Sequence, residues 1–188
     1  GSEMCIRDSA KKAADMGVDM IVLTGNPGVG VDNKAITKAL ADLNEAVGDR
    51  VILTAGKMHA SGILSEAGEK ILTKEDAETF IEAGADVLLL PAPGTVPGFT
   101  MEHAAELIKT AHEKGVLAMT TIGTSQEGAD EETIRQIALM CKMAGADIHH
   151  IGDSGYMGMA LPENITAYSV AIRGKRHTYR RMAMSLVR

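Results

Sequence analysis

Short apolar runs alternate with longer amphipathic stretches along almost the whole chain. Strands covered on both faces read as continuous apolar runs, as in parallel sheets, rather than as alternating apolar and polar residues. The pattern therefore predicts five buried parallel strands. They cover residues 20–24, 51–55, 87–90, 117–122 and 148–151.

The stretches between these runs carry the period of amphipathic helices. Ile134, Ile137 and Cys141, for example, recur at intervals of three and four, which places them on one face of a helix. The same spacing is found in the other stretches. Helices are expected at residues 33–46, 74–83, 101–114, 131–144 and 162–184.

A unit of about 30 residues, the size of one strand plus its crossover helix, repeats along the chain. Its punctuating glycines are spaced by 31, 36, 31 and 30 residues. A glycine in the left-handed conformation is a common helix end, and the aspartate of the repeated Gly-x-Asp word would complete the turn before the next strand. The glycines are Gly17, Gly48, Gly84, Gly115 and Gly145, and the aspartates are Asp19, Asp86 and Asp147.

Five successive βα units fit either an open doubly wound sheet or part of a (β/α)8 TIM barrel. A doubly wound sheet concentrates its glycine signature after one strand. Here a polar, glycine-rich loop follows every strand, as in the barrel, which gathers such loops at one face. A complete barrel needs about 250 residues. We therefore expect an N-terminally truncated barrel showing strands 4–8, with two unpaired edges that make this chain insoluble or self-associating.

Residues 1–9 look foreign to this pattern. Their reverse translation resembles the end of a transposase-type sequencing adaptor read in frame, and a tag or a genuine short N-terminus is the alternative. On the adaptor interpretation the protein proper is a partial barrel domain over residues 10–188. The whole chain has a formal charge of −6. Residues 1–9 contribute −1 of this, from one arginine and two acidic residues, so residues 10–188 carry −5.

Composition narrows the functional classes. The 45% of hydrophobic residues and the modest net charge exclude intrinsic disorder, and two cysteines cannot make a disulfide scaffold. A pI near 5.5 and 3% aromatic residues argue against nucleic-acid binding. No apolar run reaches the roughly 18–20 residues of a membrane span. We expect a cytoplasmic protein that binds a small molecule and neither nucleic acid nor a membrane. The sequence does not decide whether the full-length protein forms a homo-oligomer.

Two glycine-rich loops are the first candidates for ligand binding. They follow the fourth and fifth predicted strands, which are barrel strands seven and eight if the strand count holds, and loops there frequently bind phosphate. Glycine lets backbone N–H groups approach an anion, and hydroxyl groups add donors. Plain turns are the alternative. The candidates are Gly123, Thr124 and Ser125, and Gly152, Ser154 and Gly155 with Asp153 as a carboxylate partner.

Lys57 and His59 follow the second predicted strand. Residues two apart in extended backbone share a side, so both are expected at the barrel mouth. A lysine there can form a Schiff base or carry protons, and a histidine can move protons near neutral pH. A solvent-facing lysine with a structural histidine is the alternative. Asn26 either contacts the substrate or only shapes a turn.

No metal site is expected from the residues of this chain. His149 and His150 are adjacent on a strand and therefore point to opposite faces, and no other cluster has ligand spacing. The cofactor stays unassigned, and Mg²⁺ would have to bind through residues outside this sequence. The basic residues of the last helix are expected on a solvated or subunit-facing surface.

Several strings of the chain resemble an uncharacterised bacterial TIM-barrel family, whose members are often labelled phosphoenolpyruvate phosphonomutase-like or haloacid dehalogenase-like hydrolase. The resemblance covers nearly everything after Ser9. It implies the barrel fold and small phosphorylated or carboxylated substrates. The strings are residues 23–28, 54–59, 145–156 and 173–182.

The resemblance transfers no catalytic residue. A haloacid dehalogenase needs an Asp-x-Asp motif after its first strand, in a different fold, and this chain has none. Phosphonomutases hold Mg²⁺ through acidic residues mostly in the first half of the barrel, which is not in this sequence. The principal hypothesis is an enzyme with lyase, isomerase or hydrolase chemistry that uses Lys57, His59 and Asp153. The alternatives are a non-catalytic ligand-binding or scaffold barrel, and an assembly fragment without a function of its own.

Overall fold

The computed structural model describes residues 3–184 except 27, 29, 61, 124 and 153–159. Its elements agree with the predicted ones to within one residue at nearly every boundary, which confirms the apolar pattern. The strands are β1 (Met20–Thr24), β2 (Ile52–Gly56), β3 (Val87–Pro91), β4 (Leu117–Ile122) and β5 (Ile148–Ile151). The helices are α1 (Glu3–Asp15), α2 (Asn33–Val47), α3 (Lys74–Glu82), α4 (Met101–Glu113), α5 (Glu131–Ala144) and α6 (Pro162–Ala183).

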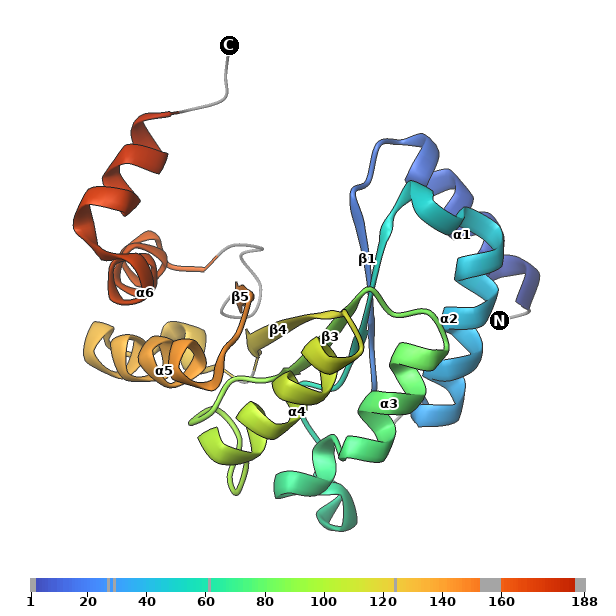
Figure 1. Ribbon diagram of the computed structural model, residues 1–188, viewed down its shortest axis with the longest axis horizontal. Helices are drawn as coiled ribbons and strands as arrows, with labels where there is room; N and C mark the ends of the chain where they lie inside the picture. The colour runs from blue at the N-terminus through green and yellow to red at the C-terminus, as the bar shows by residue number, and fades with distance from the viewer. Residues whose placement is uncertain are drawn as a thin grey trace.

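The strands form one parallel sheet in chain order, β1-β2-β3-β4-β5. A doubly wound sheet reverses its strand order at a switch point, and none occurs among these strands. The sheet curls, and the helices lie in an arc along its outer side (Figure 1). The described residues therefore form part of an α/β barrel rather than an open sheet. That they are strands 4–8 of a truncated barrel stays a prediction.

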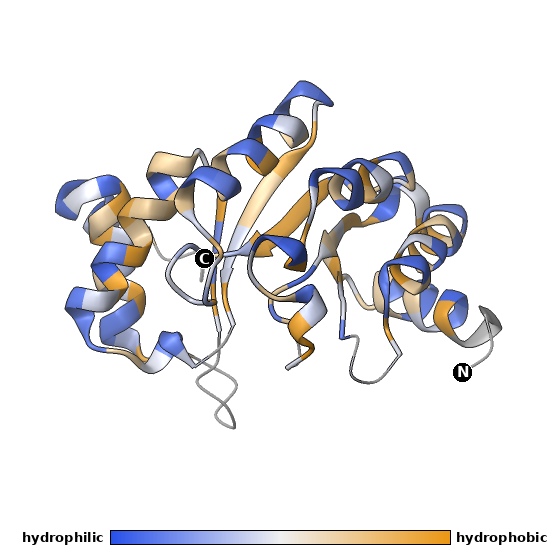
Figure 2. Ribbon diagram, turned by 90° about the horizontal axis from the view of Figure 1, so that it is seen from below, coloured by the Kyte–Doolittle hydropathy of each residue, from blue (hydrophilic) through white to orange (hydrophobic). Residues whose placement is uncertain are grey.

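Each strand has a helix-facing side and an inner side. On β3, Leu88 and Leu90 pack with the residues of the helices in the main core, and Val87 and Leu89 pack on the inner side with Met119 of β4. All five are at most 5% exposed. Figure 2 shows the same order, with apolar strands in the middle and polar surfaces on the helices around them.

The helix-to-strand turns have the predicted conformation. Gly84 and Gly145 have φ values of 106° and 99°, so each closes its helix in the left-handed region. Two residues later, an aspartate contacts the preceding strand: Asp86 accepts a hydrogen bond from the Leu53 N–H, and Asp147 accepts one from the Ala118 N–H, both at 2.8 Å. The glycine of the Gly-x-Asp motif thus ends a helix, and its aspartate forms a hydrogen bond with the preceding strand.

Helix α6 differs from the predicted continuous helix. Gly174 has φ 77° and ψ 161°, which is not helical, so the chain kinks there. Glycine adopts this backbone conformation at little steric cost, which a pattern of apolar spacing does not reveal.

Helix α1 begins at Glu3 and therefore runs through most of the segment interpreted as adaptor sequence. Arg7 forms ion pairs with Asp42 and Glu45 of α2, at 2.7 and 2.8 Å. The adaptor interpretation of residues 1–9 stays a prediction. Among the described residues, no helix is both long and apolar enough to cross a membrane.

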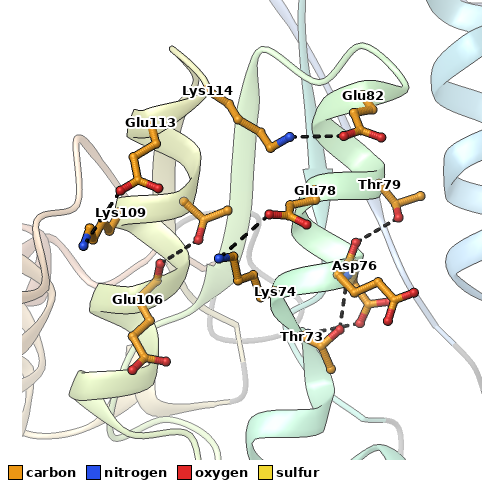
Figure 3. A network of polar contacts seen from close by, with 12 residues as sticks. Thr73, Lys74, Asp76, Glu78, Thr79, Glu82, Glu106, Lys109, Glu113 and Lys114 are labelled. Carbon is orange, nitrogen blue, oxygen red and sulfur yellow. Dashed lines mark hydrogen bonds and ion pairs between the residues drawn. The ribbon is translucent and has the colours of Figure 1, made fainter.

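A network of polar contacts covers the outer surface of α3 and α4 (Figure 3). Thr73 and Asp76 form a capping box at the start of α3, and Lys114, which follows α4, pairs with Glu82 of α3 at 3.1 Å. Exposed pairs of this kind contribute about 0.2–1 kcal/mol each. The network therefore ties neighbouring helices together and is not a site candidate.

Candidate functional site

The candidate residues lie at one edge of the sheet, because parallel strands that pair in register end together. Thr24 pairs with Gly56, Pro91 with Thr121, and Ile122 with Ile151. The loops that follow these residues carry nearly all the candidates from the sequence. In β/α barrels, the active site lies at this carboxyl edge.

Lys57 directly follows β2 and is buried. Its side chain is 4% exposed, and its Nζ atom lies 2.9 Å from Glu66 Oε2. Glu66 belongs to a short 3-10 helix, Leu64–Glu66, and its side chain is one-third exposed. The structure therefore holds a shielded ammonium against a carboxylate that reaches solvent.

The stem of Lys57 runs along the helix-facing side of the sheet. Gly25 is beside it, and a Cβ atom at Gly25 would lie 2.8 Å from Lys57 Cγ and 3.1 Å from Ile36 Cδ1 of α2. Glycine at position 25 leaves the room that the stem occupies. The Lys57 stem therefore lies beside Gly25, directly after β1, and that Lys57 and His59 face the barrel mouth stays a prediction.

His59 and Asn26 lie in neighbouring loops. His59 is half-buried, two residues beyond Lys57. The backbone of Asn26 pairs with Val31 in both directions, at 3.0 and 3.1 Å, and closes the loop that follows β1. These backbone bonds do not involve the Asn26 side chain, so both interpretations of Asn26 stay predictions.

The two glycine-rich loops are seen in part. Gly123 abuts Met58, since a Cβ atom at Gly123 would lie 2.9 Å from the Met58 sulfur. Ser125 has φ 74° and is the one non-glycine residue of the described part with positive φ. Gly152 donates to the Ile122 carbonyl at 2.9 Å. The remaining candidates lie outside the described residues: Thr124, Asp153, Ser154 and Gly155.

Sequence reasoning missed Glu66 and Glu127. Glu127 is 5% exposed, and its Oε2 has no hydrogen-bond partner in the part of the chain that the structure describes. It lies beside Gly152, at whose position a Cβ atom would be 3.6 Å from Glu127 Cδ. A buried carboxylate oxygen without a partner is costly, so Glu127 is a candidate for contact with a ligand. Neither residue belongs to a motif, and only their burial and neighbours single them out.

His149 and His150 point to opposite sides of β5, as expected from their adjacency. His149 Nδ1 lies 3.0 Å from the hydroxyl of Tyr168 in α6. Burial lowers the pKa of His149 and raises those of Tyr168 and Cys141. Across residues 3–184, apart from the gaps named above, no three His, Cys, Asp or Glu side chains cluster closely enough to hold a metal ion.

Solved structures with the same fold include several aldolases. A tetrameric deoxyribose phosphate aldolase from Aeropyrum pernix matches with a TM-score of 0.65 and 20% identity, over 92% of this chain and 67% of that one. A protein from Coccidioides immitis, provisionally described as a deoxyribose-phosphate aldolase, matches with a TM-score of 0.66 and 13% identity. The match covers 91% of this chain and 62% of that one. A Burkholderia cenocepacia J2315 protein, provisionally described as a phosphonomutase, matches with a TM-score of 0.63 and 20% identity. The match covers 89% of this chain and 72% of that one.

These likenesses support the TIM-barrel fold, and this chain spans about two-thirds of the length of the structures it matches. None of the structures named here supports the haloacid dehalogenase label. A search of curated proteins found no match. A sequence model matches residues 2–188, and the chain therefore belongs to that model's family, described as domain of unknown function DUF7916.

Proposed function

We propose that this protein is a lyase-type enzyme that acts on a small phosphorylated or carboxylated carbonyl compound at the carboxyl edge of the sheet. The observation that carries the proposal is the buried ion pair of Lys57 and Glu66 directly after β2. A lysine held out of water next to an acid–base partner is suited to Schiff-base chemistry. The aldolases among the solved structures of this fold support carbon–carbon lyase chemistry as the proposed reaction class.

The reaction would begin with a proton transfer from Lys57 Nζ to Glu66. The neutral amine then attacks the substrate carbonyl, and the resulting carbinolamine loses water, with Glu66 returning the proton to the departing hydroxyl. The product is an iminium ion. The bond between the α and β carbons then breaks and sends its electron pair into the iminium, while a base removes the proton of the hydroxyl on the β carbon. Protonation and hydrolysis of the enamine release the second product and restore Lys57.

The other candidates would have supporting roles in this scheme. His59, two residues after Lys57 in the sequence, would act as the base, with Asp153 as its partner. The phosphate or carboxylate of the substrate would bind the loops after β4 and β5 through Gly123, Thr124, Ser125, Gly152, Ser154 and Gly155. Glycines there allow backbone N–H groups to reach an anion. Mg²⁺ has no assigned ligands in this scheme.

Reductive trapping tests the proposal. The 188-residue chain is incubated with pyruvate or glyceraldehyde 3-phosphate, reduced with borohydride, and mapped by mass spectrometry. We expect a reduced adduct on Lys57 that Lys57→Arg abolishes and Glu66→Gln slows at least tenfold. Lys74→Arg, at an exposed lysine of α3, is the matched control and should leave trapping unchanged. Equal labelling of wild type and Lys57→Arg would remove Lys57 from the reaction.

A non-catalytic ligand-binding barrel is the second candidate. The observation that favours it is the 4% exposure of the Lys57 side chain, which suits a structural ion pair that anchors the Leu64–Glu66 turn to β2. Thermal-shift measurements with phosphorylated metabolites, with and without Mg²⁺, separate the two. A ligand-induced shift without any borohydride adduct would favour the binding protein, and a shift that requires Mg²⁺ would favour metal-dependent isomerase or hydrolase chemistry.

A further inference from the structure

The repeated aspartate of the Gly-x-Asp word makes a two-point contact with the strand before it. The Asp86 N–H donates to the Leu53 carbonyl at 2.8 Å, and its carboxylate accepts from the Leu53 N–H at 2.8 Å. Asp147 repeats both bonds with Ala118, at 3.0 and 2.8 Å. Leu53 and Ala118 are each the second residue of their strand. The contact therefore sets the register between consecutive strands, and we call it the aspartate clamp.

Asp19 occupies the same place before β1, but it makes neither contact of the clamp within the described residues. Gly17 has φ 87°, like the glycines of the other two words. The Asp19 carbonyl accepts from the Ile52 N–H of the following strand at 2.9 Å, as the Asp86 carbonyl does from the Leu117 N–H at 3.2 Å. Among the described residues, neither the carboxylate nor the N–H of Asp19 has a hydrogen-bond partner.

The surroundings of β1 are apolar on both sides of its free edge. Val22, on the inner side, is 44% exposed. On the outer side, a groove of about 530 Å³ opens between α1, β1 and α2, and it is lined mostly by small and aliphatic side chains, including Ala10, Ala13, Ile21 and Leu23. A strand that paired with β1 would cover both surfaces and satisfy its backbone groups.

We propose that the β1 edge takes up one further parallel strand, which directly precedes α1 in a longer form of this polypeptide, and that Asp19 clamps the second residue of that strand. The position of α1 identifies the occupant. Helix α1 packs on α2 along the outer side of the sheet and leads into β1 (Figure 1). A right-handed crossover through α1 places its preceding strand beside β1, on the side away from β2.

The clamp specifies what the strand must provide. Its second residue must offer a free N–H and carbonyl, so proline is excluded there. Neighbouring residues on the helix-facing side should be apolar, because they would enter the groove beside Ile21 and Leu23. This inference concerns the completion of the barrel and is independent of the chemistry proposed for Lys57.

A graft of the chain's own strand tests the proposal. Residues 117–130, which comprise β4, its loop and the helix-capping Asp130, are duplicated and joined in front of Glu3. This join separates the copied Ala118 from Asp19 by the same 29 residues that separate Ala118 from Asp147. We expect the grafted chain to melt at a higher temperature than the original, and the copied Ala118 amide to be protected from hydrogen exchange.

Substitution of Asp19 provides the decisive comparison. Asp19→Ala should lower the Tm of the grafted chain by about 4 °C or more, as Asp147→Ala should in either chain, and should leave the Tm of the ungrafted chain unchanged. A graft whose copied Ala118 is replaced by proline should lose the gain in Tm. These differences in Tm do not depend on enzymatic activity.

Three outcomes would overturn the proposal. The first is an ungrafted chain in which Asp19→Ala lowers the Tm as much as Asp147→Ala does, because the carboxylate would then already have a partner. The second is a grafted chain that gains neither stability nor amide protection. The third is a dimer of the ungrafted chain that Asp19→Ala dissociates in sedimentation experiments, which would assign the edge to a second copy.

Discussion

His149 is a titratable residue held in an apolar setting between β5 and α6. Its ring centroid lies 5.4 Å from that of Tyr168, and its Nδ1 atom lies 3.0 Å from the Tyr168 hydroxyl. Burial lowers the pKa of His149 below its ordinary value of 6.5, although the charge of Asp147 acts in the opposite direction. The folded protein therefore prefers the neutral imidazole.

This preference predicts a pH dependence of stability. Below about pH 6.5 the unfolded chain binds a proton at His149 that the folded chain resists, so the free energy of unfolding should fall as the pH falls towards the folded pKa. The slope from this residue is at most about 1.4 kcal/mol per pH unit. Urea unfolding of wild type and His149→Asn between pH 5 and pH 8 measures it.

His149→Asn should flatten the profile in that window, and His177→Asn, at an exposed histidine, should not. Asp147 does not change its charge between pH 5 and pH 8, so it adds no slope to the stability profile in this window. Burial raises its pKa, but hydrogen bonds from His112 and from the Ala118 N–H outweigh this effect, and the pKa stays below its ordinary 3.8. Parallel profiles for wild type and His149→Asn would refute the assignment.

At the scale of elements, one buried amide fixes the start of α6, whereas Ala167 and Tyr168 pack in the core further along the helix. Asn164, in the first turn, is 3% exposed, and its Nδ2 donates to the carbonyls of Glu127 and Ala129, each at 2.8 Å. The N-cap residue Leu161 makes no side-chain hydrogen bond. The start of α6 therefore depends on Asn164 for its position against the loop that connects β4 to α5.

Asn164→Ala should lower the free energy of unfolding by about 2–3 kcal/mol, because two carbonyl groups lose their donor, at least one of them buried. Urea denaturation monitored by circular dichroism measures the loss. Glu163→Ala, at an exposed neighbour in the same turn, is the control and should change stability by less than about 0.5 kcal/mol. A loss of similar size in both variants would mean that the helix start, rather than the amide, is responsible.

At the scale of the whole molecule, the inner side of the curled sheet is only partly covered. Val87 and Leu89 are buried there, whereas Ile52 is 44% exposed and Leu117 49% exposed. Thr54 Oγ1, buried on the same side, has no hydrogen-bond partner within the described residues. Ile52 and Leu117 therefore expose apolar side chains at the starts of β2 and β4.

The inner surface should bind an apolar dye and promote self-association. Replacement of both Ile52 and Leu117 by threonine should reduce 8-anilinonaphthalene-1-sulfonate fluorescence and shift sedimentation towards the monomer. The Tm should change little, because both residues are already nearly half exposed. Leu64→Thr, at a residue 89% exposed on a loop, is the control. Dye binding that is equal in the double variant and wild type would contradict this prediction.

Local pattern alone predicted the five strands, the helices α2 to α6 and the barrel-type order of the described residues, but not α1. The run 117–122 and the helix 131–144 were predicted with their observed bounds, because apolar period and turn glycines act between close neighbours in the chain. The same logic placed Lys57 at the end of a strand. Its burial beside Gly25 and its ion pair with Glu66 depended on the tertiary structure.

Only the tertiary structure decided which groups are buried together. Glu66 and Lys57 are nine residues apart across an irregular loop, and Asn164 reaches Glu127 from 37 residues away. The three aspartates of the repeated word are alike in sequence, yet two are clamped and Asp19 is not. Period and propensity are properties of neighbouring residues, whereas burial and pairing depend on which distant segments the fold brings into contact.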